Sequence, residues 1–230
     1  MRGARLGVGT PVAWIVGVGV FALPLALVVV AGGTTPRQFA ARGLGIPDPW
    51  TLDNVAAVIG PLAGPIATTA GVAILVAAVQ TTSSVLAAYV FARVPFAGRG
   101  VLFAITIAGY AIPPVVTFLP VYLAVARLGL AGTFTALVLP TALASPFAVL
   151  LLRQWIAGLP AELFDAAQLD GAGHLATIRR VVVPLSRPAI AAAALAAGVS
   201  GWNAYLWPRL VAGVRLPQLQ VGRASCRERV

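Results

Sequence analysis

The segment from Leu159 to Pro188 reads LPAELFDAAQLDGAGHLATIRRVVVPLSRP. It is polar and punctuated by glycine and proline, and long apolar segments lie on both sides of it. Because those flanking segments are long enough to cross a membrane, the polar segment is expected to lie in water. We therefore expect it to bind another protein.

The order of residues in this segment is specific. Asp165, Ala166 and Ala167 are followed after three residues by Gly171, and after nine more by V-x-V-P, which ends at Pro184. This order resembles the EAA loop of the permease subunits of binding-protein-dependent ABC importers of the carbohydrate/maltose-type class, which reads E-A-A, three residues, G, nine residues, I-x-L-P. An aspartate replaces the usual glutamate and valines replace the isoleucine and leucine, but the spacing is the same. The resemblance covers about residues 10–222 and includes LVLPTALASPFAVLLLRQWIAGLP and WNAYLWP.

The composition is that of a membrane protein. Apolar residues make up 60% of the chain and charged residues 10%, and the mean hydropathy is +0.95, unlike ordinary soluble domains. A helix needs roughly 20 apolar residues to cross a bilayer, and five stretches reach that length: about 11–31, 66–92, 101–126, 128–152 and 188–210. The predicted fold class is an all-α, polytopic membrane helix bundle with five spans. A secretory signal peptide is a competing interpretation of the first stretch, although its apolar run is long for one.

The domain organisation is predicted to be simple. We expect residues 1–222 to form a single transmembrane permease domain, with a core at about 66–222 and a cytoplasmic coupling loop at 159–187. The ending GRASCRERV changes abruptly from apolar to Arg-rich. It is either a basic tail next to the membrane or, as we favour, a non-native or frame-shifted stretch over residues 223–230. The resemblance implies six spans, so a C-terminal span is expected to be missing.

The arginines bear on the orientation in the membrane. The formal net charge is +10, but the arginines are scattered, which does not favour a nucleic-acid-binding face. With a cytoplasmic N-terminus, eight arginines lie inside and five outside, which is the bias expected of cytoplasmic loops. The inner set is Arg2, Arg5, Arg93, Arg99, Arg153, Arg179, Arg180 and Arg187, and the outer set is Arg37, Arg42, Arg127, Arg209 and Arg215. We predict a multi-pass protein of the bacterial cell membrane with a cytoplasmic N-terminus.

The polar residue types exclude several activities. All 16 basic residues are arginines, and a Walker A motif needs a lysine at the nucleotide phosphates, so the chain is not expected to hydrolyse ATP by that route. No cluster of His, Cys and carboxylates has metal-ligand spacing, and the lone His174 is predicted to be a surface residue. Every acid lies outside the apolar spans, which argues against a proton-driven carrier. We predict that the chain is not an enzyme and holds no metal or cofactor, and that ATP is bound by partner subunits only.

The polar loop is expected to contain two helices. Proline suits the first turn of a helix and an acid suits its positive end, so a helix is predicted from Ala161 to about Leu169. Glycine can take the left-handed conformation that ends a helix, and a second helix is predicted from about Gly173 to near Pro184. The residues expected to form the ATPase-coupling loop are Glu162, Asp165, Ala166, Ala167, Asp170, Gly171 and Pro184. The alternative is an ordinary amphipathic loop helix that packs on the protein's own spans.

Helix-breaking residues mark the remaining segments. A short helix capped by Thr51 is predicted at Leu52–Ile59, within a Gly/Pro-rich extracytoplasmic loop at 32–65. The third and fourth predicted spans contain prolines at 113, 114, 120, 140 and 146. Proline removes a backbone donor and kinks a helix, which a membrane tolerates only where neighbouring groups satisfy the freed carbonyl. The third span is therefore expected to face the bundle or a cavity rather than lipid.

The fifth predicted span begins PAIAAAALAAGVSGWNAYLWP. Its small residues suit close approach to another helix, and the amide of Asn203 is expected to face the interior. Trp202 and Asn203 are the candidate residues of the translocation pathway. The alternatives are an interhelical hydrogen bond from Asn203 and an interfacial aromatic belt formed by Trp202, Tyr205 and Trp207.

The resemblance implies the transmembrane subunit of an ABC importer, which forms half of the translocation pathway for a sugar and couples to a cytoplasmic ATPase through the EAA-like loop. Its implied partners are a second homologous permease subunit, two cytoplasmic ATPase subunits, an extracytoplasmic solute-binding protein and membrane lipid, with no nucleic acid. A permease for a polyol or glycerol phosphate is the alternative within transport. The rivals from other classes are a structural membrane scaffold and an integral-membrane enzyme, which would need a convergent set of acids, His or Cys.

Overall fold

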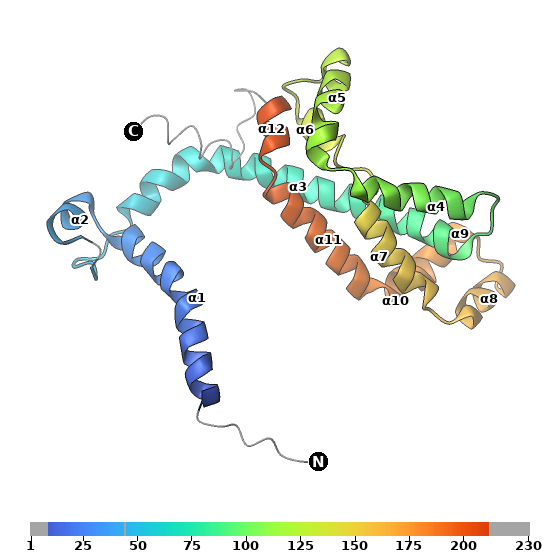
Figure 1. Ribbon diagram of the computed structural model, residues 1–230, viewed down its shortest axis with the longest axis horizontal. Helices are drawn as coiled ribbons and strands as arrows, with labels where there is room; N and C mark the ends of the chain where they lie inside the picture. The colour runs from blue at the N-terminus through green and yellow to red at the C-terminus, as the bar shows by residue number, and fades with distance from the viewer. Residues whose placement is uncertain (1–8, 44, 212–230) are drawn as a thin grey trace. The chain divides into compact units, whose positions relative to one another are not determined.

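The computed structural model describes residues 9–43 and 45–211, and the regular structure over these residues is entirely helical (Figure 1). The helices are α1 (Gly9–Gly33), α2 (Pro36–Arg42), α3 (Asp53–Arg93), α4 (Arg99–Ala108), η1 (Gly109–Ala111), α5 (Pro114–Arg127), α6 (Phe134–Val138), α7 (Pro146–Ala157), α8 (Ala161–Leu169), α9 (His174–Thr177), the π-helix η2 (Ile178–Val182), α10 (Val183–Leu185), α11 (Arg187–Trp202) and α12 (Leu206–Val211). The predicted all-α membrane-type bundle is confirmed. The predicted foreign tail at 223–230 and the expected loss of a sixth span fall outside the described residues.

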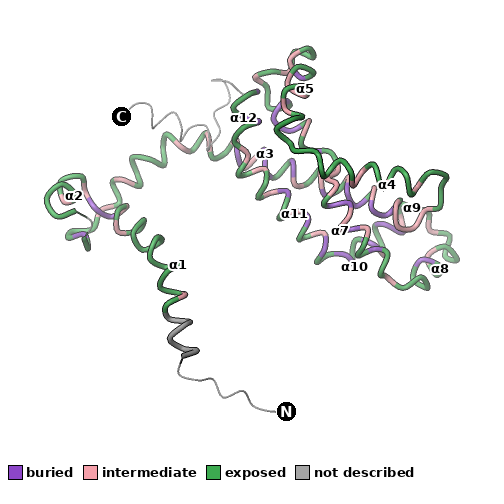
Figure 2. Tube along the Cα trace, in the orientation of Figure 1, coloured by how far each residue is buried: buried purple, intermediate pink, exposed green. Residues whose placement is uncertain are grey.

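The described residues divide into two compact units at the Ala63–Gly64 boundary. In the first unit, the amide of Asn54 donates to the carbonyls of Gly32 and Thr34 at 3.1 and 2.7 Å, which ties the start of α3 to the end of α1. Thr35 and Gln38 form a capping box at the start of α2, which satisfies backbone donors that a helix start leaves unpaired. Most described residues of α1 are exposed (Figure 2), as suits an apolar helix that lies in lipid.

The predicted short helix at Leu52–Ile59 has the predicted cap at Thr51, but it does not end at Ile59. The hydroxyl of Thr51 accepts the backbone N–H of Asp53 at 3.0 Å, but the helix that starts there continues for 41 residues as α3. It therefore runs through Pro61 and Pro65, where a loop was predicted. Each proline removes one backbone donor, whereas leaving the helix in apolar surroundings would leave many backbone groups without partners.

Two described helices are long and apolar enough to cross a bilayer, Val16–Gly33 within α1 and Asp53–Arg93, and three bent helix pairs raise the number to as many as five. The predicted spans at 11–31 and 66–92 lie within α1 and α3. The predicted span at 101–126 is instead broken after η1, and the helices on either side of the break meet at 101°. The span at 128–152 was wrong as a single helix, because only α6 and the first half of α7 are helical there. The fifth, at 188–210, is interrupted between α11 and α12.

Proline explains the positions of the two breaks in the third and fourth predicted spans. Pro114 is the first residue of α5 and Pro146 the first of α7, where a missing N–H costs nothing because no helical acceptor precedes it. The residue before each proline is extended, with ψ of 129° at Pro113 and 132° at Ser145, because proline disfavours the helical region for its predecessor. The sequence predicted kinks at these prolines, and the helices end there altogether.

Polar side chains of α3 bond to the backbone of the segment between α6 and α7. The amide of Gln80 donates to the carbonyl of Thr141 at 2.8 Å, and the hydroxyl of Ser84 accepts the N–H of Ser145 at 3.2 Å. These two α3 residues are one helical turn apart, so one face of α3 supports the non-helical segment. Non-helical backbone at membrane depth needs such partners within the protein.

The buried residues of the second unit form two clusters (Figure 2). One joins α3, α7, α8, η2 and α11 and includes Leu152, Phe164 and Val182. The other joins α3, α5, α6 and α12 and includes Leu137 and Trp207. The small residues of the fifth predicted span do allow a close approach, as predicted, because a Cβ placed on Gly201 would lie 3.1 Å from the Cα of Ala73.

We predict that Ser84→Ala lowers the free energy of unfolding by about 1 kcal/mol, because it removes the partner of the Ser145 N–H in a partly buried site. Unfolding in mixed micelles measures this change. The control is Ser83→Ala, since the Ser83 hydroxyl donates only to carbonyls of its own helix, those of Val79 and Gln80. Equal effects of the two substitutions would contradict the support assigned to Ser84.

Candidate functional site

The first helix of the loop, α8, has the predicted bounds of Ala161 and Leu169. Its N-cap is Pro160, and Glu162 lies in its first turn, where an acid interacts favourably with the positive end of the helix. Phe164 is buried, whereas Asp165 and Ala166 are exposed and Ala167 is half-buried. The helix is therefore held by its aromatic residue, and it presents the acid and a small side chain on its surface.

The end of α8 is a Schellman motif. Asp170 is the C-cap, and Gly171 follows it in the left-handed conformation with φ of 73°. The N–H of Gly171 donates to the carbonyl of Gln168, and the N–H of Ala172 donates to that of Ala167, each at 2.9 Å. These are the two bonds that define the motif. The predicted left-handed glycine is confirmed, and it sets the direction in which the chain leaves α8.

The second half of the loop is helical from His174 to Leu185, close to the predicted range of Gly173 to Pro184. Its middle is the π-helix η2, a form that is rare and frequently found at functional sites. Ile178 and Val182 are buried in the cluster that holds Phe164. Pro184 lies within α10, so it sits in the last turn rather than beyond it.

The end of α3 contacts both halves of the loop. The guanidinium of Arg93 donates to the carbonyls of Ile156 at 2.8 Å and Leu159 at 2.5 Å, and its Cζ lies 4.0 Å from the centre of the Phe164 ring. One turn earlier, the hydroxyl of Tyr89 lies 3.0 Å from Nδ1 of His174. His174 is exposed, as predicted, but its ring has this partner, which the sequence did not indicate.

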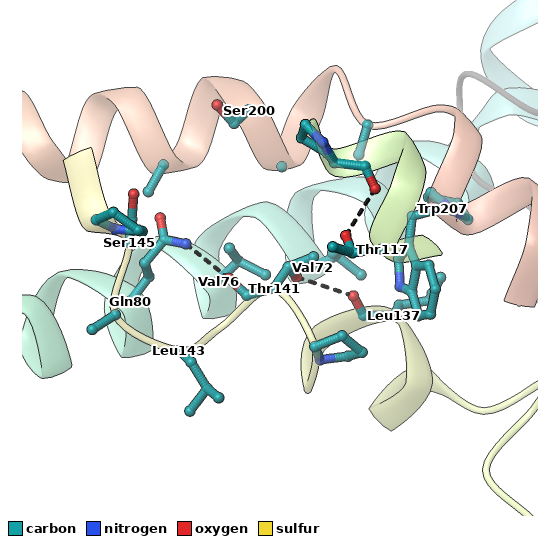
Figure 3. Close-up of a pocket in the computed structure, with 18 of the residues that line it drawn as sticks. Val72, Val76, Gln80, Thr117, Leu137, Thr141, Leu143, Ser145, Ser200 and Trp207 are labelled. Carbon is teal, nitrogen blue, oxygen red and sulfur yellow. Dashed lines mark hydrogen bonds between the residues drawn. The ribbon is translucent and has the colours of Figure 1, made fainter. Parts of the chain in front are cut away.

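A cavity of about 490 Å³ lies at the other end of the second unit, among α3, α5, α6, α11 and α12. Gln80, Ser145 and Ser200 line it from three different parts of the chain, and Figure 3 shows Gln80 beside Thr141, with Trp207 at the other side. The broken third predicted span lines it through Gly109, Ile112, Pro114 and Thr117. The prediction that this kinked span faces a cavity is therefore confirmed.

Trp202 and Asn203 lie outside this cavity. Asn203 is exposed and is the C-cap of α11, and its amide donates to the Val199 carbonyl of the same helix at 3.0 Å. The expected inward orientation and the alternative of an interhelical bond were therefore wrong, because the helix end supplies an acceptor within one turn. Trp202 is 37% exposed. Trp207 is buried and donates to the carbonyl of Ala136 at 3.0 Å, so it does not belong to an interfacial belt. The role of Trp202 and Asn203 in a pathway stays a prediction.

A protein family described as binding-protein-dependent transport system inner membrane component matches residues 80–224. This range is more than half of the chain, and it includes the whole loop and most of the cavity lining. The chain belongs to this family. The resemblance stated from the sequence is confirmed, and so is the prediction that the chain is a transport permease rather than an enzyme.

Three relatives are similar to this permease. It is 34% identical over 140 residues to the arabinooligosaccharides transport system permease protein AraQ of Halalkalibacterium halodurans, and 43% identical over 118 residues to the osmoprotective compounds uptake permease protein GgtD of Synechocystis. These matches cover 61% and 51% of the chain and only 50% and 40% of the relatives. A third, the sn-glycerol-3-phosphate transport system permease protein UgpE of Yersinia pestis, is 32% identical over 206 residues, which is 86% of the chain and 73% of the relative.

A solved structure shares the fold. One chain of a bacterial ABC transporter involved in the import of the acidic polysaccharide alginate superposes with a TM-score of 0.82, at 21% sequence identity. The match covers 98% of this permease and 82% of that chain. At this identity the likeness establishes the fold alone.

Sequence reasoning missed the contact between Arg93 and Phe164, which holds the loop against the end of α3. Arg93 was counted only as an inner-surface charge, and no contact was predicted for Phe164. Arg93 and Phe164 are 71 positions apart in the chain, and no local sequence pattern predicts a contact over that separation.

We predict that Gly171→Val speeds amide hydrogen exchange at residues 170–172 by roughly 5- to 30-fold, because a left-handed backbone costs an L-residue about 1–2 kcal/mol or more. Gly173→Val is the control, because Gly173 has an extended backbone with φ of −70° and open space around its Cβ position. Mass spectrometry of exchanged peptides measures both variants. Unchanged exchange in Gly171→Val would contradict the role of the left-handed turn.

Proposed function

We propose that this permease forms half of the translocation pathway of an ABC importer for a sugar, and that the loop at 159–187 couples it to a cytoplasmic ATPase. The observation that carries the proposal is the single family match over residues 80–224, which contains both the helix with the Schellman end and most of the polar cavity lining. The partners are a second homologous permease, two ATPase subunits, an extracytoplasmic solute-binding protein and lipid.

The chemistry of α8 supports the coupling role. Ala166 is exposed on it and Ala167 half-buried, and such small side chains allow another surface to approach the backbone closely. Glu162, Asp165 and Asp170 are exposed too and supply charge for recognition. Closure of two ATPase subunits would move the loop and with it the attached helices, a mechanical transition between two packed arrangements. The permease itself holds no cofactor, and ATP stays on the partner subunits.

The positions of the arginines support a cytoplasmic N-terminus. Arg93 at the end of α3 bonds to the segment that leads into α8, so this end of α3 and the loop lie on the same side. Both are predicted to be cytoplasmic from the distribution of arginine. Because α1 precedes α3 in the chain, a cytoplasmic N-terminus is consistent with α3 returning to the inner surface.

The lining of the cavity favours a sugar over a phosphate ester. It includes Gln80, Thr117, Thr141, Ser145, Ser200 and Trp207, and the described residues that line it include no lysine, arginine, aspartate or glutamate. Hydroxyl and amide groups with an aromatic ring suit a neutral polyhydroxylated solute, whereas a phosphate group is usually held by arginine or lysine. A volume of about 490 Å³ is in the range of small-molecule pockets. Glycerol phosphate remains the second candidate, because UgpE covers most of the chain.

We predict ATP-dependent uptake of an oligosaccharide when the permease is reconstituted in proteoliposomes with its second permease, ATPase and binding protein. The probes are radiolabelled arabino-oligosaccharide, alginate oligosaccharide and sn-glycerol 3-phosphate, and the control omits ATP. Preferential uptake of sn-glycerol 3-phosphate would support the second candidate. If the assembled complex takes up none of the probes in an ATP-dependent way, the proposed sugar import is wrong.

We also predict that Gly171→Val abolishes the stimulation of ATP hydrolysis by the binding protein, while membrane insertion stays intact. The physical reason is that α8 loses the turn that orients it. Gly173→Val, in which the backbone is extended, should keep the stimulation. Normal stimulated hydrolysis in Gly171→Val would sink the coupling role of the loop and favour the scaffold alternative.

A further inference from the structure

Arg93 joins three parts of the second unit, which are the end of α3, the end of α7 and the start of the loop. It is the last residue of α3. Its guanidinium bonds to the carbonyl of Ile156 in α7 and to that of Leu159, which immediately precedes the N-cap of α8. The flat side of the same group covers Phe164 of α8. The joint between α7 and α8, at residues 158–160, is thus held from outside by the end of α3.

Each contact of Arg93 has a clear physical basis. The last carbonyls of a helix lack partners within the helix and carry partial negative charge, so the C-terminus of α7 is a natural site for a guanidinium. A guanidinium can donate in its plane and stack on an aromatic ring at the same time. Phe164 is 6% exposed and belongs to the core cluster, so its ring offers Arg93 a packed surface on α8.

The joint is where α8 changes direction. α7 and α8 meet at an angle of 81°, and Figure 1 shows α8 at the end of the second unit at which α3 finishes. Any rotation of α8 about this joint must either break the contacts of Arg93 or carry the end of α3 with it. Tyr89, one turn earlier on α3, contacts His174 of α9, so the second half of the loop is attached to the same face of α3.

The same helix reaches the cavity. Gln80 and Ser84 of α3 bond to the broken segment that includes Thr141 and Ser145, and both of these residues line the cavity. A continuous set of contacts therefore leads from α8 through Arg93 and α3 to the cavity wall. Contiguous packed elements of this kind can carry a coupling free energy between distant sites.

We infer that Arg93 is the positioning residue that transmits the movement of α8 to α3, and through α3 to the cavity. The inference rests on the proposed coupling function of the loop. It assigns to one side chain outside the EAA-like segment the task of making the loop and α3 move together. Arg93 is not among the described residues that line the cavity, and it acts through Phe164 and the end of α7.

Arg153 offers a matched control. It is also a half-buried arginine near the end of a helix, and its Cζ lies 4.6 Å from the centre of the Phe103 ring in α4. The Nε atoms of both arginines are buried without a hydrogen-bond partner among the described residues. The described contacts of Arg153 include no residue of the loop, so removing it disturbs a similar stack without disturbing α8.

The test measures how accessible the cavity is to a reagent in solution. Cys226 is replaced by serine, and Ser200, which lines the cavity, is replaced by cysteine as a reporter. The rate at which a membrane-impermeant maleimide labels this cysteine is measured in the assembled importer, with and without ATP, Mg²⁺ and orthovanadate. Co-purification of the ATPase subunit and its basal ATP hydrolysis are measured in the same preparations. This readout needs no knowledge of the solute.

We predict that Arg93→Met reduces the nucleotide-dependent change in labelling rate roughly fivefold or more, while ATPase co-purification and basal hydrolysis stay unchanged. Arg153→Met should keep the full change. Arg93→Lys should lose part of it, because one ammonium cannot donate to both carbonyls and stack flat on the ring. Arg93→Met combined with Phe164→Leu should lose no more than the larger single effect, since the two residues act as one unit.

Three results would overturn the inference. One is that Arg93→Met keeps the same nucleotide-dependent change in labelling rate as Arg153→Met, whereas Gly171→Val loses it. The second is that the double variant loses as much of the nucleotide-dependent change in labelling rate as the product of the two single effects. The third is failure of the ATPase subunit to co-purify with either Arg93 variant, which would make Arg93 part of the docking surface. A parent protein with bound ATPase but no nucleotide-dependent change would instead contradict the proposed coupling function itself.

Discussion

Backbone groups at membrane depth have no water to bond to, and this constraint governs the second unit of the permease. Proline ends two of its apolar segments at membrane depth, and the backbone between α6 and α7 becomes non-helical as a result. Gln80 and Ser84 of α3 supply partners for that backbone. Without those two side chains the break would lose the partners of the Thr141 carbonyl and the Ser145 N–H, so the broken segment depends on the long helix.

The same interaction makes the cavity. A continuous fourth helix would have filled the space beside α3, and the break opens it and lines it with hydroxyl groups and proline rings (Figure 3). Small residues on α11 then bring that helix against α3, as the approach of Gly201 to Ala73 shows. The cavity is therefore bounded by the long helix α3 and by a broken segment that is hydrogen-bonded to it.

The loop differs in that local structure sets its shape, while buried side chains such as Ile178 and Val182 attach it to the core. α8 ends in a complete Schellman motif, so its shape needs no partner. It is attached to the rest of the unit through Phe164, through the joint at 158–160, and through His174 of the following helix. Movement of the outer face of α8 reaches the core through these attachments and through the contact of α8 with η2, whose Ile178 and Val182 are buried in the same cluster as Phe164. This is why a single arginine at one of them has a testable role.

Much of the loop could be predicted because its structure is local. The bounds of α8, the left-handed Gly171 and the cap by Thr51 follow from residue types within one or two turns, and the structure agrees with each. The prolines predicted where the third and fourth segments depart from straight helices. They did not predict whether a helix kinks or ends, because that depends on whether another helix offers partners for the freed backbone. Pro61 and Pro65 lie within α3 and Pro146 begins a new helix, although the residues are of the same type.

The family, the all-helical fold and the form of the loop were thus decided by the sequence itself, through spacing, hydropathy and local backbone preference. The tertiary structure alone decided what the polar residues within and beside the spans do. Asn203 bonds to its own helix although an inward orientation was expected, Gln80 and Ser84 support a break 61 residues away, and Arg93 reaches Phe164 across the unit. The physical reason is that a polar side chain in apolar surroundings bonds to whichever partner the packing brings within reach, and residues distant in the chain decide which partner that is.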